Sequence, residues 1–340
     1  MTKHTMTVGL DLGDRYSHVF LLADEDEGEQ SRVATTPVGM RRFFERIPPA
    51  RVVLEVGTHS RWVSQQLKEM GHDVIVANPR RVRLITENAR KSDQNDPELL
   101  ARLGRADVKL LSPIEHRSSE SHRVLSLVRA RDGLVRARTK LINQCRGVAK
   151  SWGYRFSKCA SSTFHRSAMP VELAPVLDPL MHAIATLTEQ IKGCERTMKG
   201  LSEQIPEAAL VRQVSGVGPV LSLAFVATLE EPKRFRRNRS VGAYLGLCPR
   251  RDQSGNADPQ LPISKAGDPY LRRLLVSAAN HILGPRGRDS DLRRWGLERA
   301  TRGGKNAKKR AVVGVARKLA VLMLTLWKTE QTYQPLRKAA

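Results

Sequence analysis

The chain has 340 residues and a formal net charge of +24, because 58 Lys and Arg outnumber 34 Asp and Glu. A surface with this charge attracts a polyanion, most commonly nucleic acid. The longest apolar run, "AVLMLTL" from Ala320, is too short to cross a bilayer, and the first residues contain no long apolar segment, so neither a membrane span nor a signal peptide is expected. The four cysteines are far apart and form no CxxC pair, which is typical of reduced thiols in a cytosolic protein and excludes a disulfide framework or a zinc site.

The first third of the chain alternates between strand-like and helix-like patterns. Short β-branched runs predict strands at 7–13, 32–37, 50–57 and 72–79, with "SHVFLLAD" between the first two. A helix is expected between the last two strands, closed by Gly71, and another through "PELLARL". This order predicts an α/β domain with a mixed sheet at residues 1–112.

The middle of the chain, from about residue 118 to 205, has the periodicity of long helices. Apolar pairs recur every seven residues from Leu127/Val128 to Val148/Ala149, and a strict four-three spacing follows. The positions with this spacing are Leu180, Ile184, Leu187, Ile191, Cys194, Met198, Leu201 and Ile205. The pattern predicts an antiparallel helical pair or a coiled coil at 113–207, with an irregular linker or loop near 153–176. Such a seam often joins subunits, although an internal hairpin has the same pattern.

The last part, from about residue 208, is basic and mostly helical. "VSGVGPVLSLAFVATL" fits either a helix-hairpin-helix element, whose backbone amides meet a phosphate, or an ordinary turn before a buried helix. "CPRRDQSGNADPQLPISKAGDPYLRRLL" is a polar loop leading into a helix, and "TRGGKNAKKRAVVGVARKLAVLML" is a basic loop running into an amphipathic helix. The candidates for nucleic-acid contacts are Gly216, Gly218, Arg250, Arg251, Lys265, Arg272, Arg273, Lys305, Lys308 and Lys309.

Four carboxylates in the first domain are candidate metal ligands. Asp11 and Glu55 each lie at the end of a predicted strand, and Asp93 and Asp96 lie three residues apart at a helix start, on one face. Taken singly, an Asp after a strand is more simply a turn former, and an Asp at a helix start is more simply a cap. The set of four in one α/β domain instead favours hard oxygen ligands for Mg²⁺ or Mn²⁺, acting on phosphodiesters.

These motifs together resemble a known family. The order "GLDLG", "LEVGT", "KSDQNDPELLA", a heptad region, "SGVGPVLSLAF", "YLGLCPRRDQSGN" and "ISKAGDPYLRRLL" is similar to that of the DEDD transposases of insertion-sequence family one-ten, relatives of the Piv-type DNA invertases. The resemblance covers nearly the whole chain. It implies a RuvC-like, ribonuclease-H-type N-terminal domain, a coiled-coil connector and a mostly helical C-terminal transposase domain.

The resemblance also assigns residues. It implies that Asp11, Glu55, Asp93 and Asp96 are the DEDD carboxylates, and that Ser254 in the "PRR…SG" motif is the nucleophile. Spacing alone does not choose Ser254 over Ser264 or Ser240. One departure is Pro97, because many relatives have Ala after the second aspartate.

The family implies how such a protein works. Mg²⁺ at the carboxylates of one subunit would act with the serine of another subunit in a dimer or tetramer. A structured bridge RNA encoded beside the gene often pairs with donor and target DNA. The protein would act in the prokaryotic cytoplasm, at the nucleoid.

Three alternatives remain open at this point. They are an invertase that reads its sites directly, a RuvC-like junction nuclease that uses water, and a nucleic-acid-binding scaffold whose carboxylates are only caps. The aromatic content of 5% favours recognition of backbones over a stacking platform for single strands.

Overall fold

The structure is a computed structural model that describes residues 6–23, 28–79, 95–254, 259, 261–304 and 306–337. The chain forms two compact units, Met1–His116 and Arg117–Ala340, called here the N-terminal and the C-terminal unit. No described helix combines the length and the apolar character that crossing a membrane requires. All four cysteines are free thiols.

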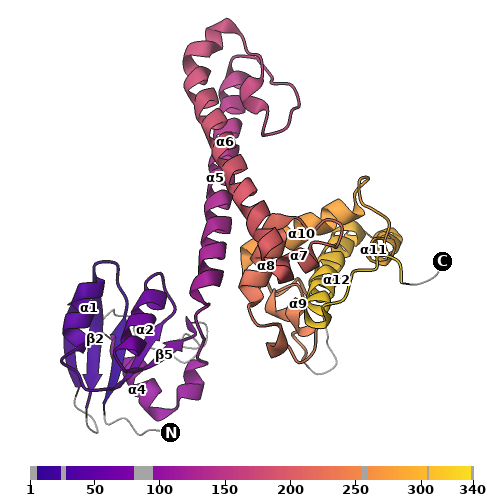
Figure 1. Ribbon diagram of the computed structural model, residues 1–340. Coiled ribbons are helices and arrows are strands. Elements are labelled where there is room, and N and C mark those ends of the chain that lie inside the picture. Colours follow the sequence, from indigo (N-terminus) through magenta and orange to yellow (C-terminus); the bar gives the residue numbers. More distant parts are fainter. Residues whose placement is uncertain are drawn as a thin grey trace. The chain divides into compact units, whose positions relative to one another are not determined.

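The N-terminal unit is built on a five-stranded sheet (Figure 1). Its strands are β1 (Thr7–Asp11), β2 (Tyr16–Leu22), β3 (Gly28–Ala34), β4 (Arg51–Glu55) and β5 (Asp73–Ala77). The order is β3-β2-β1-β4-β5; β1 is antiparallel to β2 and parallel to β4, and β4 is parallel to β5. The predicted α/β domain with a mixed sheet is therefore confirmed.

Helices cover both faces of this sheet. On one face, Val8, Leu10, Val52 and Leu54 pack in a common core with residues of α1 (Pro37–Phe44) and α2 (Ser60–Glu69). On the other face, the odd-numbered Val53 packs with residues of α4 (Asn95–Ala106) and the 3₁₀ helix η1 (Val108–Leu111). Successive side chains of a strand point to opposite faces, so the nearly continuous apolar runs of the sequence follow from burial on both sides.

Helix α1 was not expected from the sequence, which predicted a strand at 32–37. The strand ends at Ala34, and the Thr36 hydroxyl caps the helix by accepting a hydrogen bond from the Gly39 amide at 3.0 Å. Pro37 then occupies the first turn, where its missing N–H is not needed. The Thr-Pro pair was the available signal for a helix start.

Helix α4 lies unusually close to β1, at Gly9. An ideal Cβ on Gly9 would lie 1.7 Å from the Pro97 carbonyl oxygen and 2.9 Å from the Ala101 amide nitrogen. Further along the helix, Gly104 lies against Val53, and the Thr7 side chain is within 4 Å of its Cβ position. Helix α4 therefore runs antiparallel to β1, and its first turn lies toward the C-terminal end of that strand.

We expect Gly9→Ala to destabilise the N-terminal unit by about 1–3 kcal/mol, the usual cost of overpacking. The added methyl overlaps backbone atoms of α4, so the helix must move from the sheet. Calorimetric unfolding of the full chain measures the loss. The matched control is Gly57→Ala, whose Cβ would meet nothing within 4 Å. Equal unfolding temperatures for the two variants would contradict the close packing of α4.

Two long helices, α5 (Ser119–Ser151) and α6 (Ala174–Gln204), form a hairpin in the C-terminal unit (Figure 1). The Ser118 hydroxyl caps α5 by accepting from the Ser121 amide at 3.1 Å. The predicted antiparallel pair is confirmed, but the predicted seam is only half right. The seam positions Ile184, Ile191 and Met198 are buried.

The other predicted seam positions of α6 are only half-buried; they are Leu180, Leu187, Cys194 and Leu201. Polar contacts between the helices account for the difference. Thr188 is fully buried and receives a hydrogen bond from Arg138 at 3.3 Å, and Arg131 pairs with Glu195. Polar side chains therefore lie between the two helices, while Leu180 packs on the core at the hairpin end and Cys194 and Leu201 pack on the core around α12.

The segment predicted as a linker near 153–176 is packed against the end of the hairpin. It contains the 3₁₀ helices η2 (Phe164–Arg166) and η3 (Val171–Leu173). Phe164 is fully buried in a small core with Ile142 and Leu177 of the two long helices. The segment lacks helical periodicity, as the sequence indicated, yet it is a folded tip and not a linker.

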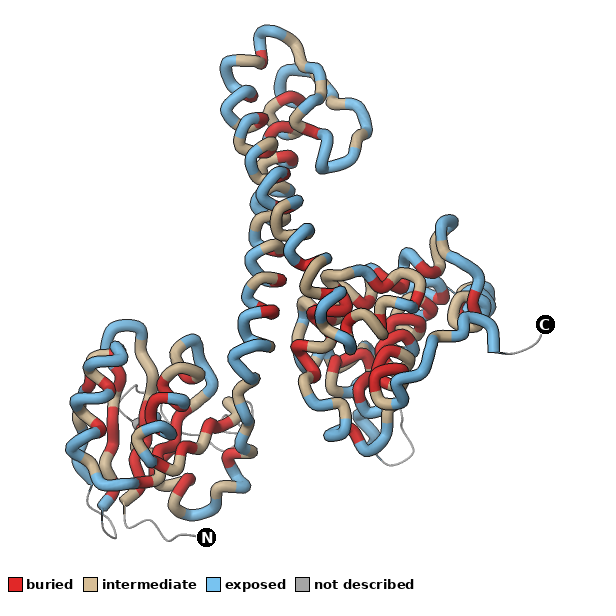
Figure 2. Tube along the Cα trace, viewed as in Figure 1, coloured by how far each residue is buried: buried red, intermediate tan, exposed pale blue. Residues whose placement is uncertain are grey.

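The remaining helices pack around α12 (Ala307–Thr329). They are α7 (Pro206–Val211), α8 (Pro219–Leu229), the 3₁₀ helix η4 (Pro232–Arg234), α9 (Ser240–Tyr244), α10 (Pro269–Leu283) and α11 (Asp291–Thr301). Val315, Leu319 and Met323 of α12 are fully buried, and Figure 2 shows the red of buried residues along this helix. The expected apolar helix after Pro219 and the basic-to-amphipathic helix near the C-terminus are both confirmed.

Candidate active site and nucleic-acid interface

Two of the predicted carboxylates end neighbouring parallel strands. The register pairs Leu10 of β1 with Leu54 of β4, so Asp11 and Glu55, the next residues, lie side by side. Both are half-buried. Asp11 is two residues from Gly9, so it lies on the sheet face that α4 covers.

The third described carboxylate, Asp96, is exposed in the first turn of α4. Because α4 runs antiparallel to β1, this turn lies toward the same edge of the sheet as Asp11 and Glu55. Asp93 lies outside the described residues. In the described ranges, no three His, Cys, Asp or Glu side chains come close enough together to hold a metal ion. Carboxylate oxygens suit Mg²⁺, and the arrangement supplies a strand-end pair with a third carboxylate on a nearby helix turn.

The loops that follow β1 and β4 contact each other beside this pair. His59 Nε2 lies 3.7 Å from Asp14 Oδ1, and His59 Nδ1 accepts a hydrogen bond from Trp62 Nε1 at 3.1 Å. With Nδ1 as acceptor, the neutral imidazole carries its proton on Nε2, toward Asp14. Sequence reasoning did not predict this contact, because only the parallel pairing of β1 and β4 brings the two loops together.

Ser254 lies on an exposed hairpin of the C-terminal unit. Pro249 and Ile263 form an antiparallel bridge, the Arg250 amide donates to the Pro262 carbonyl at 2.9 Å, and the Ser264 amide donates to the Cys248 carbonyl at 2.8 Å. The hairpin base needs Gly246 at φ 67°, because a Cβ there would lie 2.3 Å from the Ala266 carbonyl oxygen. The backbone thus holds both ends of the loop that presents Ser254.

The arginines and the lysine around this hairpin have different surroundings. Arg250, Arg251 and Lys265 are exposed. The Arg272 guanidinium donates to the carbonyls of Leu245 and Ala266 at 3.0 and 2.7 Å, so it fastens the hairpin base to α10. A contact between Arg272 and nucleic acid stays a prediction.

Arg273 is engaged with the hairpin of long helices. Its guanidinium donates to the buried Asp132 of α5, which also accepts from Arg136, and it lies 4.9 Å from the centre of the Tyr270 ring. Burial by itself would raise the pKa of Asp132, but the hydrogen bonds from Arg273 and Arg136 outweigh burial and hold the pKa below its ordinary value. This ion-pair cluster ties α10 to α5.

The two glycines of the possible helix-hairpin-helix turn differ in role. Gly216 has φ 90°, and a Cβ there would lie 3.0 Å from Ile282 Cγ1, so this turn packs on α10. Gly218 precedes α8, is exposed, and has nothing within 4 Å of its Cβ position. Packing on α10 accounts for the glycine at position 216 without a ligand. Gly218 instead leaves the backbone at the start of α8 accessible to a ligand.

The basic segment before α12 is described only in part. Lys305 lies outside the described residues, and Lys308 and Lys309 are exposed in the first turn of the helix. Cations at a helix N-terminus oppose the helix dipole, so they raise the local positive potential instead of stabilising the helix. That potential favours a phosphate.

Comparison with known families and proteins finds similarity along most of the chain. A DEDD-type IS110 family described as "Transposase" matches residues 8–152, and a family described as "Transposase IS116/IS110/IS902 family" matches residues 208–294. A "Probable family 20 transposase" of Pseudomonas aeruginosa is 29% identical over 96% of this chain and 98% of that protein.

Two further relatives carry the names of insertion sequences. The "Transposase for insertion sequence element IS1111A" of Coxiella burnetii is 29% identical over 78% of this chain and 74% of that protein. The "Transposase for insertion sequence element IS1328" of Yersinia enterocolitica is 27% identical over 80% of this chain and 82% of that protein.

Proposed function

Because the chain belongs to the IS110 family of DNA transposases, we propose that it cuts and rejoins DNA strands with a Mg²⁺-dependent carboxylate site and a serine nucleophile. The observation that carries the proposal is the pairing of Asp11 and Glu55 at the ends of adjacent parallel strands, on the face covered by α4. A mixed sheet covered by helices on both faces is consistent with a RuvC-like domain.

In this proposal Asp11, Glu55, Asp93 and Asp96 hold Mg²⁺ or Mn²⁺. Bound there, the metal would stabilise negative charge on the oxygens of the scissile phosphodiester. Asp11 and Glu55 come from strands fixed in register, so their position is set by the sheet. Asp96 approaches on α4, whose height above the sheet is set by Gly9.

Ser254 supplies the nucleophile. Its hydroxyl oxygen loses its proton and attacks phosphorus, the bond to one deoxyribose oxygen breaks, and that oxygen leaves as a hydroxyl after protonation. A hydroxyl of the second DNA strand then attacks the phosphoserine, which joins the strands and releases the serine. Arg250 and Arg251, exposed on the same loop, neutralise the charge that builds on the phosphoryl oxygens.

The active complex contains more than one copy of the chain. Carboxylates and serine lie in separate compact units, which allows the carboxylate site of one subunit to act with the serine of another. The heptad spacing of the long helices supports a coiled coil that joins subunits. We therefore include a homo-oligomer, a dimer or a tetramer, in the proposal.

A structured bridge RNA is the proposed guide. The net charge of +24 is large enough to hold RNA and DNA together, and backbone contacts by exposed Lys and Arg would leave the choice of sequence to base pairing. The alternative within the same reaction class is an invertase that reads its DNA sites directly.

One experiment distinguishes the RNA-guided transposase from the directly reading invertase. The protein is expressed from its native locus with the flanking DNA, and the nucleic acid that copurifies is sequenced. One abundant structured RNA that maps beside the gene is the expected result. A mixture of unrelated cellular RNA and DNA would instead favour direct reading of the sites. The junction nuclease and the silent scaffold are tested by the serine and carboxylate variants considered in the Discussion.

A further inference from the structure

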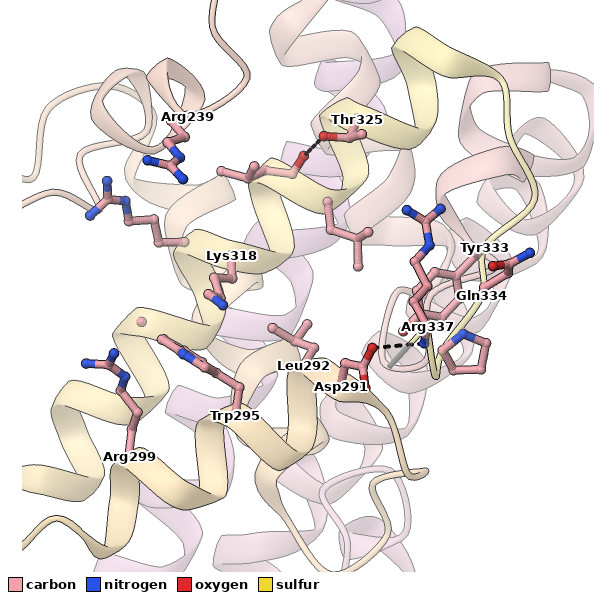
Figure 3. A pocket seen from close by; sticks show the side chains of 15 residues that line it. Arg239, Asp291, Leu292, Trp295, Arg299, Lys318, Thr325, Tyr333, Gln334 and Arg337 are labelled. Carbon is pink, nitrogen blue, oxygen red and sulfur yellow. Dashed lines mark hydrogen bonds between the residues drawn. The ribbon is translucent and has the colours of Figure 1, made fainter. Parts of the chain in front are cut away.

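A large groove lies between α11, α12 and the C-terminal segment, in the C-terminal unit. Its volume is about 710 Å³, and Figure 3 shows the side chains that line it. Most of the lining lies beyond residue 294, where the similarity to the second transposase family ends. The groove shares no residue with the carboxylate site or with the hairpin that bears Ser254.

The lining of this groove is strongly cationic. Its basic residues are Arg239, Arg299, Arg317, Lys318 and Arg337. Of the described residues that line it, only Asp291 is acidic, and the Asp291 carboxylate accepts a hydrogen bond from the Arg337 amide at 2.9 Å. An anionic ligand would therefore meet cations from four segments of the chain with little opposing charge.

A tryptophan lies among these cations. Trp295 of α11 is half-buried, with Lys318 Nζ 4.1 Å and the Arg299 guanidinium carbon 4.8 Å from its ring centre. Gly314 makes room for the indole, because a Cβ there would lie 3.0 Å from Trp295 Cη2. Figure 3 shows Lys318 and Arg299 on either side of this ring in the view.

Apolar side chains form the floor of the groove, and hydrogen bonds hold one of its walls in place. Leu292, Val321 and Leu322 give it an apolar floor beside the indole. The C-terminal segment forms the wall: the Asp291 amide donates to the Pro335 carbonyl at 2.9 Å, and the Tyr333 amide donates to Gln213 Oε1 at 2.8 Å.

We propose that this groove binds an unpaired nucleotide of a nucleic-acid strand. Lys318 and Arg299, which lie over the indole ring, turn away from it to meet the adjoining phosphates together with Arg239. The base takes their place on the Trp295 indole, beside the apolar floor. An aromatic face beside cations is the combination that unpaired bases need, whereas the bases of a duplex have their faces already stacked. The site goes beyond the proposed strand exchange and depends neither on the metal nor on Ser254.

Photocrosslinking of the full-length protein tests the base contact. The probes are short oligothymidylate that carries 5-iododeoxyuridine and oligouridylate that carries 5-iodouridine, with adducts mapped by mass spectrometry. We expect an adduct at Trp295 with at least one probe, and the stronger probe identifies the strand as DNA or RNA. Adducts confined to other regions with both probes would overturn the proposal.

Affinity measurements by fluorescence anisotropy test the energetic contribution. Trp295→Leu is expected to weaken binding of oligothymidylate about tenfold, because the variant removes the aromatic ring on which a base stacks. The same variant should leave binding of an abasic strand of equal length unchanged. An equal loss for both strands would show that no base lies on the indole and would overturn the proposal.

A double charge reversal tests the groove without changing Trp295, so its result does not depend on how that side chain packs. Arg299→Glu with Lys318→Glu should weaken single-strand binding at least as much as Trp295→Leu, since both side chains are exposed. Arg196→Glu with Lys199→Glu on α6 is the matched control, with the same charge change at exposed positions outside the groove. Equal losses for the two pairs would reduce the effect to overall charge and overturn the site.

The catalytic variants separate this proposal from that of strand exchange. Asp11→Asn and Ser254→Ala should retain the Trp295 adduct at the wild-type yield. A protein that exchanges strands but forms no Trp295 adduct would refute the groove alone. One that forms the adduct, with Asp11→Asn still fully active, would refute the carboxylate mechanism alone.

Discussion

Asp11→Asn is expected to lower Mg²⁺-dependent strand exchange by at least about a hundredfold, more than the 10–100-fold that loss of an outer-shell metal partner costs. Asn has nearly the same shape as Asp but carries no charge, so the change removes an anionic ligand without opening a cavity. Asp11 lies beside Glu55 on the sheet face that α4 covers. The rate of exchange on a synthetic donor and target at fixed Mg²⁺ measures the effect.

The matched control is Asp14→Asn, three residues along the chain. Asp14 is almost fully exposed in the turn after β1 and faces His59 at 3.7 Å. A surface pair of this kind contributes about 0–1 kcal/mol, so activity should stay near that of the wild type. DNA binding by Asp11→Asn should also be retained, because binding depends on Lys and Arg elsewhere.

The scaffold hypothesis predicts a different result. If Asp11 and Glu55 only ended their strands, Asp11→Asn and Glu55→Gln would leave both activity and binding unchanged. Under the metal hypothesis each variant alone removes most of the activity, and the double variant loses little more, because ligands that act as a unit are not additive. Full activity in Asp11→Asn would reject the metal site.

The sheet of the N-terminal unit was predictable because its strands are short and almost continuously apolar. This pattern is typical of strands that are buried on both faces of a sheet. Its first helix was not recognised, since the Thr36-Pro37 start was included in a strand that ends two residues earlier, at Ala34. The parallel pairing that brings Asp11 beside Glu55 depends on contacts across more than forty residues of chain. No local pattern encodes that pairing.

The long hairpin shows a different limit. Heptad spacing identified both helices, but it could not show which stripe of α6 faces α5. That choice depends on Arg138 reaching Thr188 and on Arg131 reaching Glu195 across the pair, and polar side chains do not contribute to an apolar repeat. The tip was read as a linker because its core is formed by irregular backbone, with Phe164 as the central side chain.

The amino-acid composition could not predict the basic groove. An aromatic content of 5% indicated backbone recognition, yet one tryptophan placed among Lys318 and Arg299 creates a local site that an average cannot reveal. Trp295 and Lys318 are 23 positions apart and meet only because α11 packs on α12.

Ser254→Ala is expected to abolish the covalent protein–DNA adduct and to lower strand exchange by at least about a thousandfold, as loss of a nucleophile does in other enzymes with covalent intermediates. The alanine removes only an exposed hydroxyl, and the hairpin is held by backbone hydrogen bonds at Arg250 and Ser264, so the fold should be unaffected. A denaturing gel of protein incubated with labelled DNA and Mg²⁺ shows the adduct directly.

Ser264→Ala is the control from the same hairpin. Among the described residues, the Ser264 hydroxyl has one hydrogen bond, which it accepts from the Ala266 amide at the long distance of 3.4 Å, so its removal should preserve both adduct and exchange. Sequence spacing does not distinguish the two serines, but the structure does, because Ser264 is half-buried at the hairpin base and Ser254 is exposed. If Ser254→Ala still cleaved the DNA at the wild-type rate without any adduct, water would be the nucleophile and the protein would act as a junction nuclease; if it kept the adduct, another side chain would be the one that attacks phosphorus.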